Sequence, residues 1–401
     1  MAAATLRVAA AFAAFYEEPV LTWALNVGCD FSGFFVELLG LAAALDAALE
    51  GRLAVAGPEC DVARLSALFS GAYSDERGVY KSLTARRRGG FRVAHGLCGD
   101  ADAVIDAARL MVEREYGPGR DEVTYACARR ARAVWAPTAW AADQFVAAGI
   151  PRSRVSVVAE AVDARAFSPA AARADGASAA AVSALLPGPR PALRILSVFK
   201  WEHRKGYDTL LAGYFSAFEA EDDVELVVHT YKPPWEEGDD DLSAAIAAFC
   251  ENGPCAPVRW LGPDPNLSRR RVRALYHASD VFALPTRGEG WGLPIHEAAA
   301  MGLPIVATNF SGPAALLSSD TAYLLDPGTT VDGFADPRAA DVAAALRDIA
   351  ANRDAAKERG AAARRRVASR FSPAAVAAEV VAAFGAFEAA GTTPYGYGAE
   401  A

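Results

Sequence analysis

The chain has 401 residues, of which 53% are hydrophobic and 22% are charged, and its formal net charge is -9 from 40 Lys+Arg and 49 Asp+Glu. This amount of apolar material excludes an intrinsically disordered chain. The acidic balance gives no electrostatic footprint for nucleic acid, so a nucleic-acid partner is not expected. Domains usually hold about 100 to 200 residues, and we therefore expect two of them.

No run of the sequence is long and apolar enough to cross a bilayer, so a soluble, cytoplasmic protein is expected, with peripheral contact to a membrane left open. Six scattered cysteines lack the paired spacing of a zinc site, and we expect reduced thiols. Cys250 and Cys255 are near enough in sequence to close a small disulfide loop, an alternative that the sequence leaves open. Whether Met1 to Tyr16, which is Ala-rich, is a targeting segment also stays open.

In the first half, short apolar runs alternate with helix-length segments, a pattern typical of βαβ units with a parallel sheet. The expected strands are Val20 to Val27, Arg52 to Gly57, Arg92 to His95, Ala133 to Pro137 and Val155 to Val158. From Ala170 to Pro191 the chain is rich in Ala, Ser, Gly and Pro. This stretch is poor material for packed structure, and we place the interdomain linker there.

The second half restarts the alternation and predicts a second doubly wound domain. The expected strands are Leu193 to Phe199, Val224 to Tyr231, Val258 to Leu261, Val281 to Pro285, Ile305 to Thr308 and Ala322 to Leu325. The expected helices are Tyr207 to Phe218, Ser268 to Ala278, Ile295 to Met301, Gly312 to Leu317 and Pro337 to Asn352. Ser372 can cap a further helix whose apolar face packs back on the first domain. The expected domains are thus 1–187 and 188–370, followed by a C-terminal helix and tail, 371–401.

The most informative segment is Thr286-Arg-Gly-Glu-Gly-Trp-Gly-Leu-Pro-Ile-His-Glu297, which follows an expected strand and runs into an expected helix. Ligands of open α/β sheets bind at this edge. Three glycines let the backbone approach an anion, and the helix that follows offers unpaired amides, so a phosphate is expected. Carboxylates beside a phosphate are suited to accept hydrogen bonds from sugar and ribose hydroxyls. An ordinary Gly-rich loop with solvated glutamates is the alternative.

This segment resembles the E-x7-E motif of retaining GT-B glycosyltransferases, the glycosyl transferases group 1 family, and the resemblance runs from Ile195 to about Phe384. It implies two Rossmann-like domains that face each other across a cleft. It also implies that Glu289 contacts the donor sugar and that Glu297 binds the nucleotide ribose. The backbone near the diphosphate is then that of Gly290, Trp291, Gly292 and Leu293.

A second match is Ser197-Val-Phe-Lys-Trp-Glu-His-Arg-Lys-Gly-Tyr-Asp-Thr-Leu-Leu211, which resembles the strand, basic loop and helix start of the same family. Lys205 matches the diphosphate-binding lysine. Where family members often carry an arginine upstream, this chain has Lys200, and Arg204 is a further candidate for the second cation. Fixed cations stabilise the charge that a departing diphosphate gains as the glycosidic bond breaks.

Residues Ala307 to Pro313 resemble the family loop that closes the donor pocket, which makes Asn309 and Ser311 candidates for sugar or base contacts. A role for these two as turn residues stays open. In the first domain, Ser32 and Gly33 lie where relatives carry a Gly-rich turn near the donor phosphate, although the paired glycines of the family are absent.

The Arg109-Leu-Met-Val-Glu113 segment resembles a plant and bacterial subgroup of the family, and by analogy Arg109 and Glu113 lie on the acceptor side. For Glu113, a salt-bridged glutamate in a helix is the alternative. His95 ends an expected strand and is a candidate for a hydrogen bond to the donor sugar, with a structural histidine as the alternative.

The resemblance implies that the protein moves a hexosyl group from a nucleoside diphosphate sugar to an acceptor hydroxyl with retention of anomeric configuration. No cofactor, metal ion or protein general base is expected, and Asp239-Asp240-Asp241 is interpreted as a solvated turn. The acceptor, be it a glycan, lipid, protein or small molecule, is not indicated. A non-catalytic scaffold or a sugar-nucleotide epimerase on the same fold are the alternatives.

Overall fold

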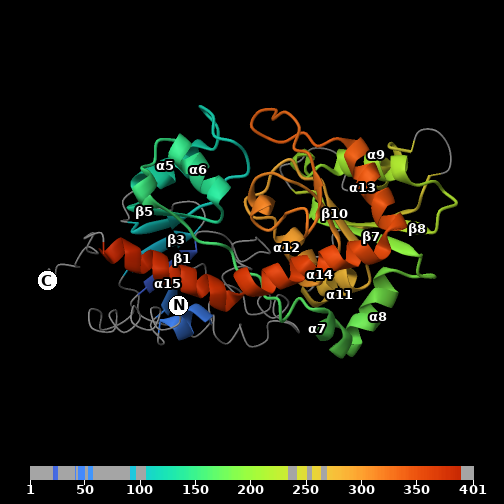
Figure 1. Ribbon diagram of the computed structural model, residues 1–401, viewed down its shortest axis with the longest axis horizontal. Helices are drawn as coiled ribbons and strands as arrows, with labels where there is room; N and C mark the ends of the chain where they lie inside the picture. The colour runs from blue at the N-terminus through green and yellow to red at the C-terminus, as the bar shows by residue number, and fades with distance from the viewer. Residues whose placement is uncertain are drawn as a thin grey trace.

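The computed structural model describes residues 21–25, 41, 44–49, 53–56, 91–95, 105–233, 242–250, 255–262 and 269–389. The described strands form two six-stranded sheets, and every strand pair is parallel. The two sheets lie side by side in separate halves of the molecule, the first in blue to cyan and the second in green to orange (Figure 1). The predicted fold class, two doubly wound α/β domains, is visible in this arrangement.

The first sheet has the strand order β2-β1-β3-β4-β5-β6. Its strands are β1 (Leu21–Leu25), β2 (Leu53–Ala56), β3 (Phe91–His95), β4 (Ala107–Arg109), β5 (Ala133–Ala136) and β6 (Val155–Val157). Two described helices, α5 (Glu122–Arg130) and α6 (Ala139–Ala147), accompany it. Thr138 begins α6 because its side chain accepts a hydrogen bond from the backbone amide of Ala141.

The second sheet has the order β12-β11-β10-β7-β8-β9. Its strands are β7 (Leu193–Lys200), β8 (Val224–Tyr231), β9 (Val258–Leu261), β10 (Val281–Leu284), β11 (Ile305–Thr308) and β12 (Tyr323–Leu325). The helices that connect them are α9 (Tyr207–Ala217), α10 (Ser243–Ala247), α11 (Arg269–His277) and α12 (Leu293–Ala300), and the sheet is followed by α13 (Ala339–Ala351) and α14 (Arg353–Arg370). The strand order reverses between β7 and β10, and ligands of such sheets bind at this switch point.

Helices cover the second sheet, and its strands β10 and β11 are buried along their whole length. All four residues of β10 and of β11 are buried. A strand buried on both faces gives a continuous apolar run in place of an alternating one. These runs made the strand predictions accurate, and β8, β9 and β11 have the predicted bounds.

One expectation was wrong, and two elements were not predicted. The stretch from Ala170 to Pro191 is not an unpacked linker, because it contains α7 (Pro169–Ala174) and α8 (Gly176–Leu185). Ser168 caps α7, and alanine has the highest helix propensity, so this composition favours helix. Both helices contact α11. The three-residue strand β4 and the 18-residue helix α14 were not predicted.

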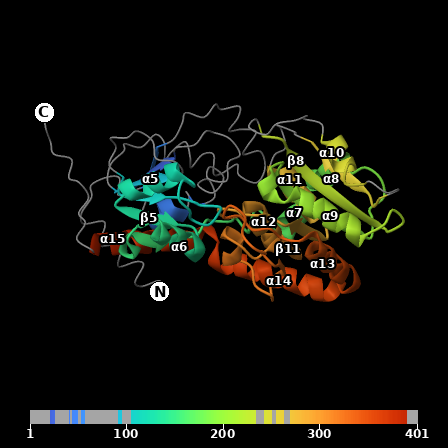
Figure 2. The same ribbon diagram turned by 90° about the horizontal axis from the view of Figure 1, so that it is seen from above.

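The last helix, α15 (Pro373–Ala389), leaves the second domain and lies along the first sheet, as two perpendicular views agree (Figure 2). The Glu379 carboxylate accepts a hydrogen bond of 2.8 Å from the backbone amide of Ala159. The Arg132 guanidinium lies 5.0 Å from the centre of the Phe387 ring. Through these contacts α15 becomes part of the structure around the first sheet.

Within the described residues, no single helix has the length and hydropathy to cross a bilayer, although α14 and α15 meet both criteria when taken together as a pair bent by 44°. The apolar side chains of α15 are buried inside the protein, with Val376, Val380 and Phe384 each 0% exposed. Their burial against the rest of the chain accounts for the hydropathy of this helix.

The expectation of reduced thiols was also wrong. Cys250 and Cys255 form a disulfide bond across five positions of sequence, and Cys127 is disulfide-bonded as well. The bond closes the small loop that the sequence left open as an alternative. Ser32, Gly33 and the Asp239 to Asp241 run lie outside the described residues.

Candidate functional site

Two loops meet at the switch point of the second sheet, one after β7 and one after β10. The backbone amide of Arg287 donates a 2.7 Å hydrogen bond to the carbonyl of Arg204 and ties the loops together. Gly206 permits their close approach, because a Cβ on this residue would lie 2.0 Å from the Pro285 carbonyl oxygen. Its φ of 70° is likewise a value that favours glycine.

The loops bring a carboxylate and two cations into contact. The Nζ of Lys205 lies 2.6 Å from Glu289 Oε1, and the Nη1 of Arg204 lies 3.7 Å from Glu289 Oε2. Thr286 Oγ1 also donates to Glu289 Oε1, at 3.3 Å. Three of the predicted catalytic residues therefore form one cluster, in which Glu289 is 5% exposed.

The charge state of Glu289 follows from two opposed effects. Burial is the largest single effect, and by itself it would raise the pKa of this carboxyl group. The charges of Lys205 and Arg204, with the hydrogen bonds from Lys205 and Thr286, outweigh it and lower the pKa from its ordinary value of 4.5. Glu289 is thus held as an ionised acceptor at neutral pH.

The backbone around Glu289 is fixed by the loop after β11. The amide of Glu289 donates to Ser311 Oγ at 2.9 Å, and the amide of Gly312 donates to the Glu289 carbonyl at 2.9 Å. Ser311 is fully buried and has a φ of 54°, which is unusual for a residue with a side chain. Of the two residues predicted on this loop, Ser311 supports Glu289, while Asn309 is exposed at the protein surface.

Helix α12 begins directly after this carboxylate. Gly292 precedes its first turn with a φ of 84°. In the described part of the chain, the amides of Gly290, Trp291, Gly292 and Leu293 donate no hydrogen bond. Amides at a helix start attract anions, because the first amides of a helix have no partner within it and the helix dipole is positive there. Together with Lys205 and Arg204, they form a place suited to a phosphate group.

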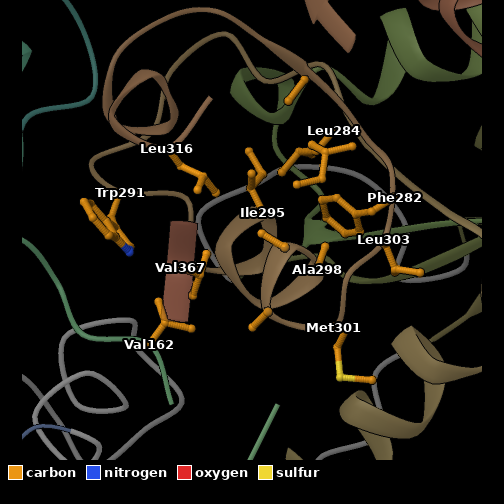
Figure 3. Packing of buried hydrophobic residues seen from close by; sticks show 14 of the residues in the cluster. Val162, Phe282, Leu284, Trp291, Ile295, Ala298, Met301, Leu303, Leu316 and Val367 are labelled. Atoms are coloured by element: carbon orange, nitrogen blue, oxygen red, sulfur yellow. The ribbon is translucent and has the colours of Figure 1, made fainter. Parts of the chain in front are cut away.

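The Trp291 side chain is buried and belongs to the hydrophobic core shown in Figure 3. Its indole stacks on the His296 ring, with the ring centres 4.0 Å apart, and meets Phe371 edge-on at 5.0 Å. His296 is fully buried, and its Nδ1 lies 3.1 Å from the Gly292 carbonyl oxygen. Since a carbonyl only accepts, Nδ1 carries the proton of this hydrogen bond. Burial lowers the pKa of His296 to about 4, so the ring is neutral.

The second glutamate of the motif, Glu297, lies one helical turn into α12 and is 2% exposed. Its Oε1 accepts a hydrogen bond from Arg269 Nη2. Its Oε2 accepts a hydrogen bond of 3.1 Å from the Tyr276 hydroxyl. Burial, followed by the charge of Glu297, raises the pKa of Tyr276 well above its ordinary value of 10.0, so this hydroxyl keeps its proton.

The remaining predicted cation is Lys200, the last residue of β7. The two cations that act most strongly on Glu289 are Lys205 and Arg204. The structure therefore joins Lys205 and Arg204, but not Lys200, to the Glu289 cluster. On the sequence, Lys200 stood where family members often carry an arginine.

The acceptor-side candidates lie in different surroundings. Arg109 is 2% exposed, and its guanidinium donates two hydrogen bonds of 2.8 Å, to the carbonyls of Val158 and Ala159. It thereby holds β4 to the chain that follows β6. His95 is the last residue of β3, where it pairs with Leu25 and Arg109 in the sheet register.

Glu113 reaches the cluster from the first domain. Its Oε1 lies 3.1 Å from Arg204 Nη1, and its side chain is 43% exposed. The backbones of the two domains also touch here, since a Cβ on Gly288 would lie 2.0 Å from the Glu113 carbonyl oxygen. Desolvation, only partly offset by Arg204 and Lys205, raises the pKa of Glu113 above 4.5. The ion pair expected in the alternative interpretation of Glu113 is present, but the expected helix is not, since Glu113 lies between β4 and α5.

Sequence reasoning missed the partners of Glu297, which are Arg269 and Tyr276. Arg269 is the first residue of the Arg269-Arg270-Arg271 run, and a run of charged residues is typical of a solvent-exposed surface. Its side chain is nevertheless only 12% exposed and is paired with Glu297. Tyr276 follows seven residues later on α11, so the two lie on one face of this helix. That periodicity was the available signal. Among the described residues, no cluster of three or more His, Cys, Asp and Glu side chains has the arrangement of a metal site.

Comparison with protein families identifies the part of the chain that carries this cluster. Residues 191–341 match the model of the family described as "Glycosyl transferases group 1". This segment is a group 1 glycosyltransferase domain. The predicted family resemblance is thereby confirmed for the segment, whereas retention and the roles given to the two motif glutamates stay predictions.

Curated relatives agree with this assignment. The chain is 29% identical over 185 residues to D-inositol 3-phosphate glycosyltransferase of Corynebacterium urealyticum, a match that covers 46% of this chain and 42% of the relative. It is 28% identical over 150 residues to 2-deoxystreptamine N-acetyl-D-glucosaminyltransferase of Niallia circulans, covering 35% of this chain and 34% of the relative. The chain thus spans less than half the length of either curated relative that it matches.

Solved structures share the whole fold. The Anabaena protein HepE in complex with UDP-glucose has a TM-score of 0.65 at 15% identity, over 90% of this chain and 98% of that one. Sucrose-phosphate synthase from Thermosynechococcus elongatus has a TM-score of 0.64 at 16% identity, over 92% of this chain and 100% of that one. At such identities the likeness shows the fold alone. The predicted GT-B fold is confirmed.

Proposed function

We propose that the protein transfers a sugar from a nucleoside diphosphate sugar to an acceptor hydroxyl, with retention of anomeric configuration. The observation that carries the proposal is the contact of 2.6 Å between Lys205 Nζ and Glu289 Oε1 beside the unpaired amides that begin α12. Cations, amides and an ionised carboxylate at one switch point suit a ligand that is anionic at one end and rich in hydroxyls at the other.

In this proposal the diphosphate binds between the α12 amides and the side chains of Lys205 and Arg204. The sugar then lies against Glu289, whose carboxylate accepts hydrogen bonds from its hydroxyls. The structural neighbour HepE was solved with UDP-glucose, which makes a UDP-sugar the first donor to test.

The negative charge that develops during the reaction explains why this arrangement favours transfer. When the bond between the anomeric carbon and the phosphate oxygen breaks, negative charge grows on the departing diphosphate. Lys205 and Arg204 stand where they stabilise that charge, and such fixed groups are worth about 10²–10³ in rate each. The acceptor oxygen bonds to the anomeric carbon on the same face, and its proton passes to the departing phosphate oxygen, so no protein base is assigned.

Glu297 is proposed to accept hydrogen bonds from the ribose. Its carboxylate is 2% exposed and held by Arg269 and Tyr276. Each carboxylate oxygen has two acceptor sites, so Glu297 retains capacity for a hydroxyl while Tyr276 stays bound. Ribose reaches this carboxylate when the Arg269 side chain moves aside, which adds Arg269 to the residues that shape the nucleotide site.

The test is a panel of UDP-, GDP- and ADP-sugars, scored by calorimetric binding and by release of the nucleoside diphosphate. Lys205→Ala and Glu289→Gln are the site variants. Lys357→Ala is the matched control, since Lys357 is 74% exposed on α14 and pairs only with a neighbour on the same helix in the described part of the chain. We expect one donor to bind, Lys205→Ala to weaken binding, both site variants to lose turnover, and the control to match the wild type.

The product separates the alternatives. An acceptor glycoside with the donor's anomeric configuration, established by NMR, supports the retaining transferase. Inversion of that configuration contradicts retention, and conversion of the donor to an epimer supports an epimerase. If the wild type binds no nucleotide sugar, the transferase proposal fails and the non-catalytic scaffold is favoured.

A further inference from the structure

Arg204 is the one side chain in the described site that contacts carboxylates from both domains. Its Nη1 donates to the Gly288 carbonyl at 2.6 Å and lies 3.1 Å from Glu113 Oε1. Its Nη2 donates to Glu202 Oε2 at 3.0 Å. Burial by itself would lower the pKa of Arg204, but the carboxylates of Glu113, Glu289 and Glu202 outweigh it and raise this pKa, so Arg204 stays charged. These carboxylates also occupy the donors that a diphosphate would need.

The carboxylates differ in how firmly they are held. Glu202 is two residues from Arg204 on the same loop and is 8% exposed, so it stays beside Arg204 whatever the domains do. Glu113 belongs to the first domain, and its side chain is 43% exposed. It is therefore the carboxylate that a change of rotamer, or a movement between the domains, separates from Arg204.

We propose that Glu113 is an internal competitor of the donor diphosphate, which occupies Arg204 across the domain boundary until a nucleotide displaces it. This inference rests on the proposed function. Glu113 then sets nucleotide affinity and release as a positioning residue for Arg204. Because this carboxylate pairs with Arg204 in the empty site, the ion pair must be broken before the diphosphate can bind. The free energy gained on nucleotide binding is therefore smaller. The position of Glu113 is fixed by Gly288, whose lack of a side chain lets the domains touch.

Competition and a purely structural role predict opposite changes in nucleotide affinity when Glu113 is replaced. If Glu113 merely supported the site, Glu113→Gln would weaken nucleotide binding. If it competes, the same variant tightens binding of the nucleoside diphosphate by about 2-fold to 5-fold, the size of one partly exposed ion pair. Glu115→Gln is the matched control, because Glu115 also faces the second domain but contacts Thr330 at 2.9 Å instead of Arg204.

The experiment is calorimetric titration of the full chain with UDP, GDP, ADP and inorganic pyrophosphate. We expect Glu113→Gln to tighten binding and Glu115→Gln to leave it unchanged. In an Arg204→Gln background we expect Glu113→Gln to have no further effect. A gain that persists there would reflect charge removal at long range and would overturn the proposal, as would unchanged or weaker binding in Glu113→Gln. If the wild type binds UDP but Glu113→Gln brings no gain, this inference fails alone, whereas no binding of any probe by the wild type overturns the proposed function with it.

Discussion

The ammonium group of Lys205 lies 2.6 Å from a carboxylate oxygen of Glu289, although the two residues are 84 positions apart in sequence. One follows β7 and the other follows β10, and these strands are neighbours in the sheet. The contact therefore depends on the crossover that places two distant strands side by side. It also determines the charge of Glu289, because burial and the lysine act on its pKa in opposite directions.

Replacement of Lys205 by methionine is expected to shift the acid limb of the pH-rate profile. In the wild type, the pKa of Glu289 is below 4.5, so Glu289 stays ionised and active down to that pH. Without Lys205, the charge that lowers this pKa most is lost while burial remains, so the pKa rises and the acid limb of the residual activity moves to higher pH. The pH dependence of kcat/KM for donor hydrolysis measures the shift. An unmoved limb in Lys205→Met, compared with the control Lys357→Met, would contradict this account of Glu289.

Ser311 is expected to respond in an unusual order to two substitutions. Ser311→Ala removes the hydrogen bond to the Glu289 amide and leaves a Cβ at a φ of 54°. Ser311→Gly removes the same bond but relieves the backbone strain, which costs about 1–3 kcal/mol for a residue with a side chain. We expect the glycine variant to be the more stable of the two by about 1 kcal/mol. Urea unfolding measures the difference in unfolding free energy. A glycine variant less stable than the alanine variant would contradict the claim that the backbone at Ser311 is strained.

Arg109 is expected to act on stability and not on acceptor recognition. Its two hydrogen bonds to the carbonyls of Val158 and Ala159 are buried, and lysine cannot make both with one ammonium group. Arg109→Lys should lower the free energy of unfolding by about 1–3 kcal/mol. Thermal unfolding and the acceptor KM, measured below the transition, separate the two roles. A raised acceptor KM at unchanged stability would instead support a role of Arg109 in acceptor recognition.

His296 is expected to make the protein sensitive to mild acid. Its pKa in the folded protein is about 4, below the ordinary value of 6.5, so the unfolded chain binds the proton more readily. Stability is therefore lost as the pH falls from about 6.5 toward 4, by up to about 3 kcal/mol for this fully buried ring. His296→Asn should show a smaller difference in unfolding free energy between pH 7.5 and pH 4.5. The same difference as in the wild type would show that other groups cause the loss.

Much of the fold was predictable because it rests on local chemistry. Strands β10 and β11 of the second sheet are buried along their whole length, and their continuous apolar runs gave their positions nearly residue by residue. The three-residue strand β4 gave no such signal, since it reads Ala-Ala-Arg within an Ala-rich chain. The same richness in alanine hid α7 and α8, because a run of small residues fits both a linker and a helix.

The candidate site was predictable where both residues of a contact belong to recognisable motifs. Glu289 and Lys205 were expected to serve one diphosphate sugar, and they are in contact. The partners Arg269 and Glu113 were not predictable as such, because each pairing depends on how two distant segments pack. No periodicity in the sequence encodes a contact between the two domains.

The return of α15 to the first sheet bears on how the protein is made. A nascent chain usually folds its N-terminal domain first, as it leaves the ribosome. Here the first sheet receives the Glu379 carboxylate and the Phe387 ring only after the second sheet and its helices have been translated. The second sheet and its helices, from α7 to α14, come from consecutive residues and need no such delay. The later domain in the sequence is thus the one that can complete its fold first, and the earlier one waits for α15.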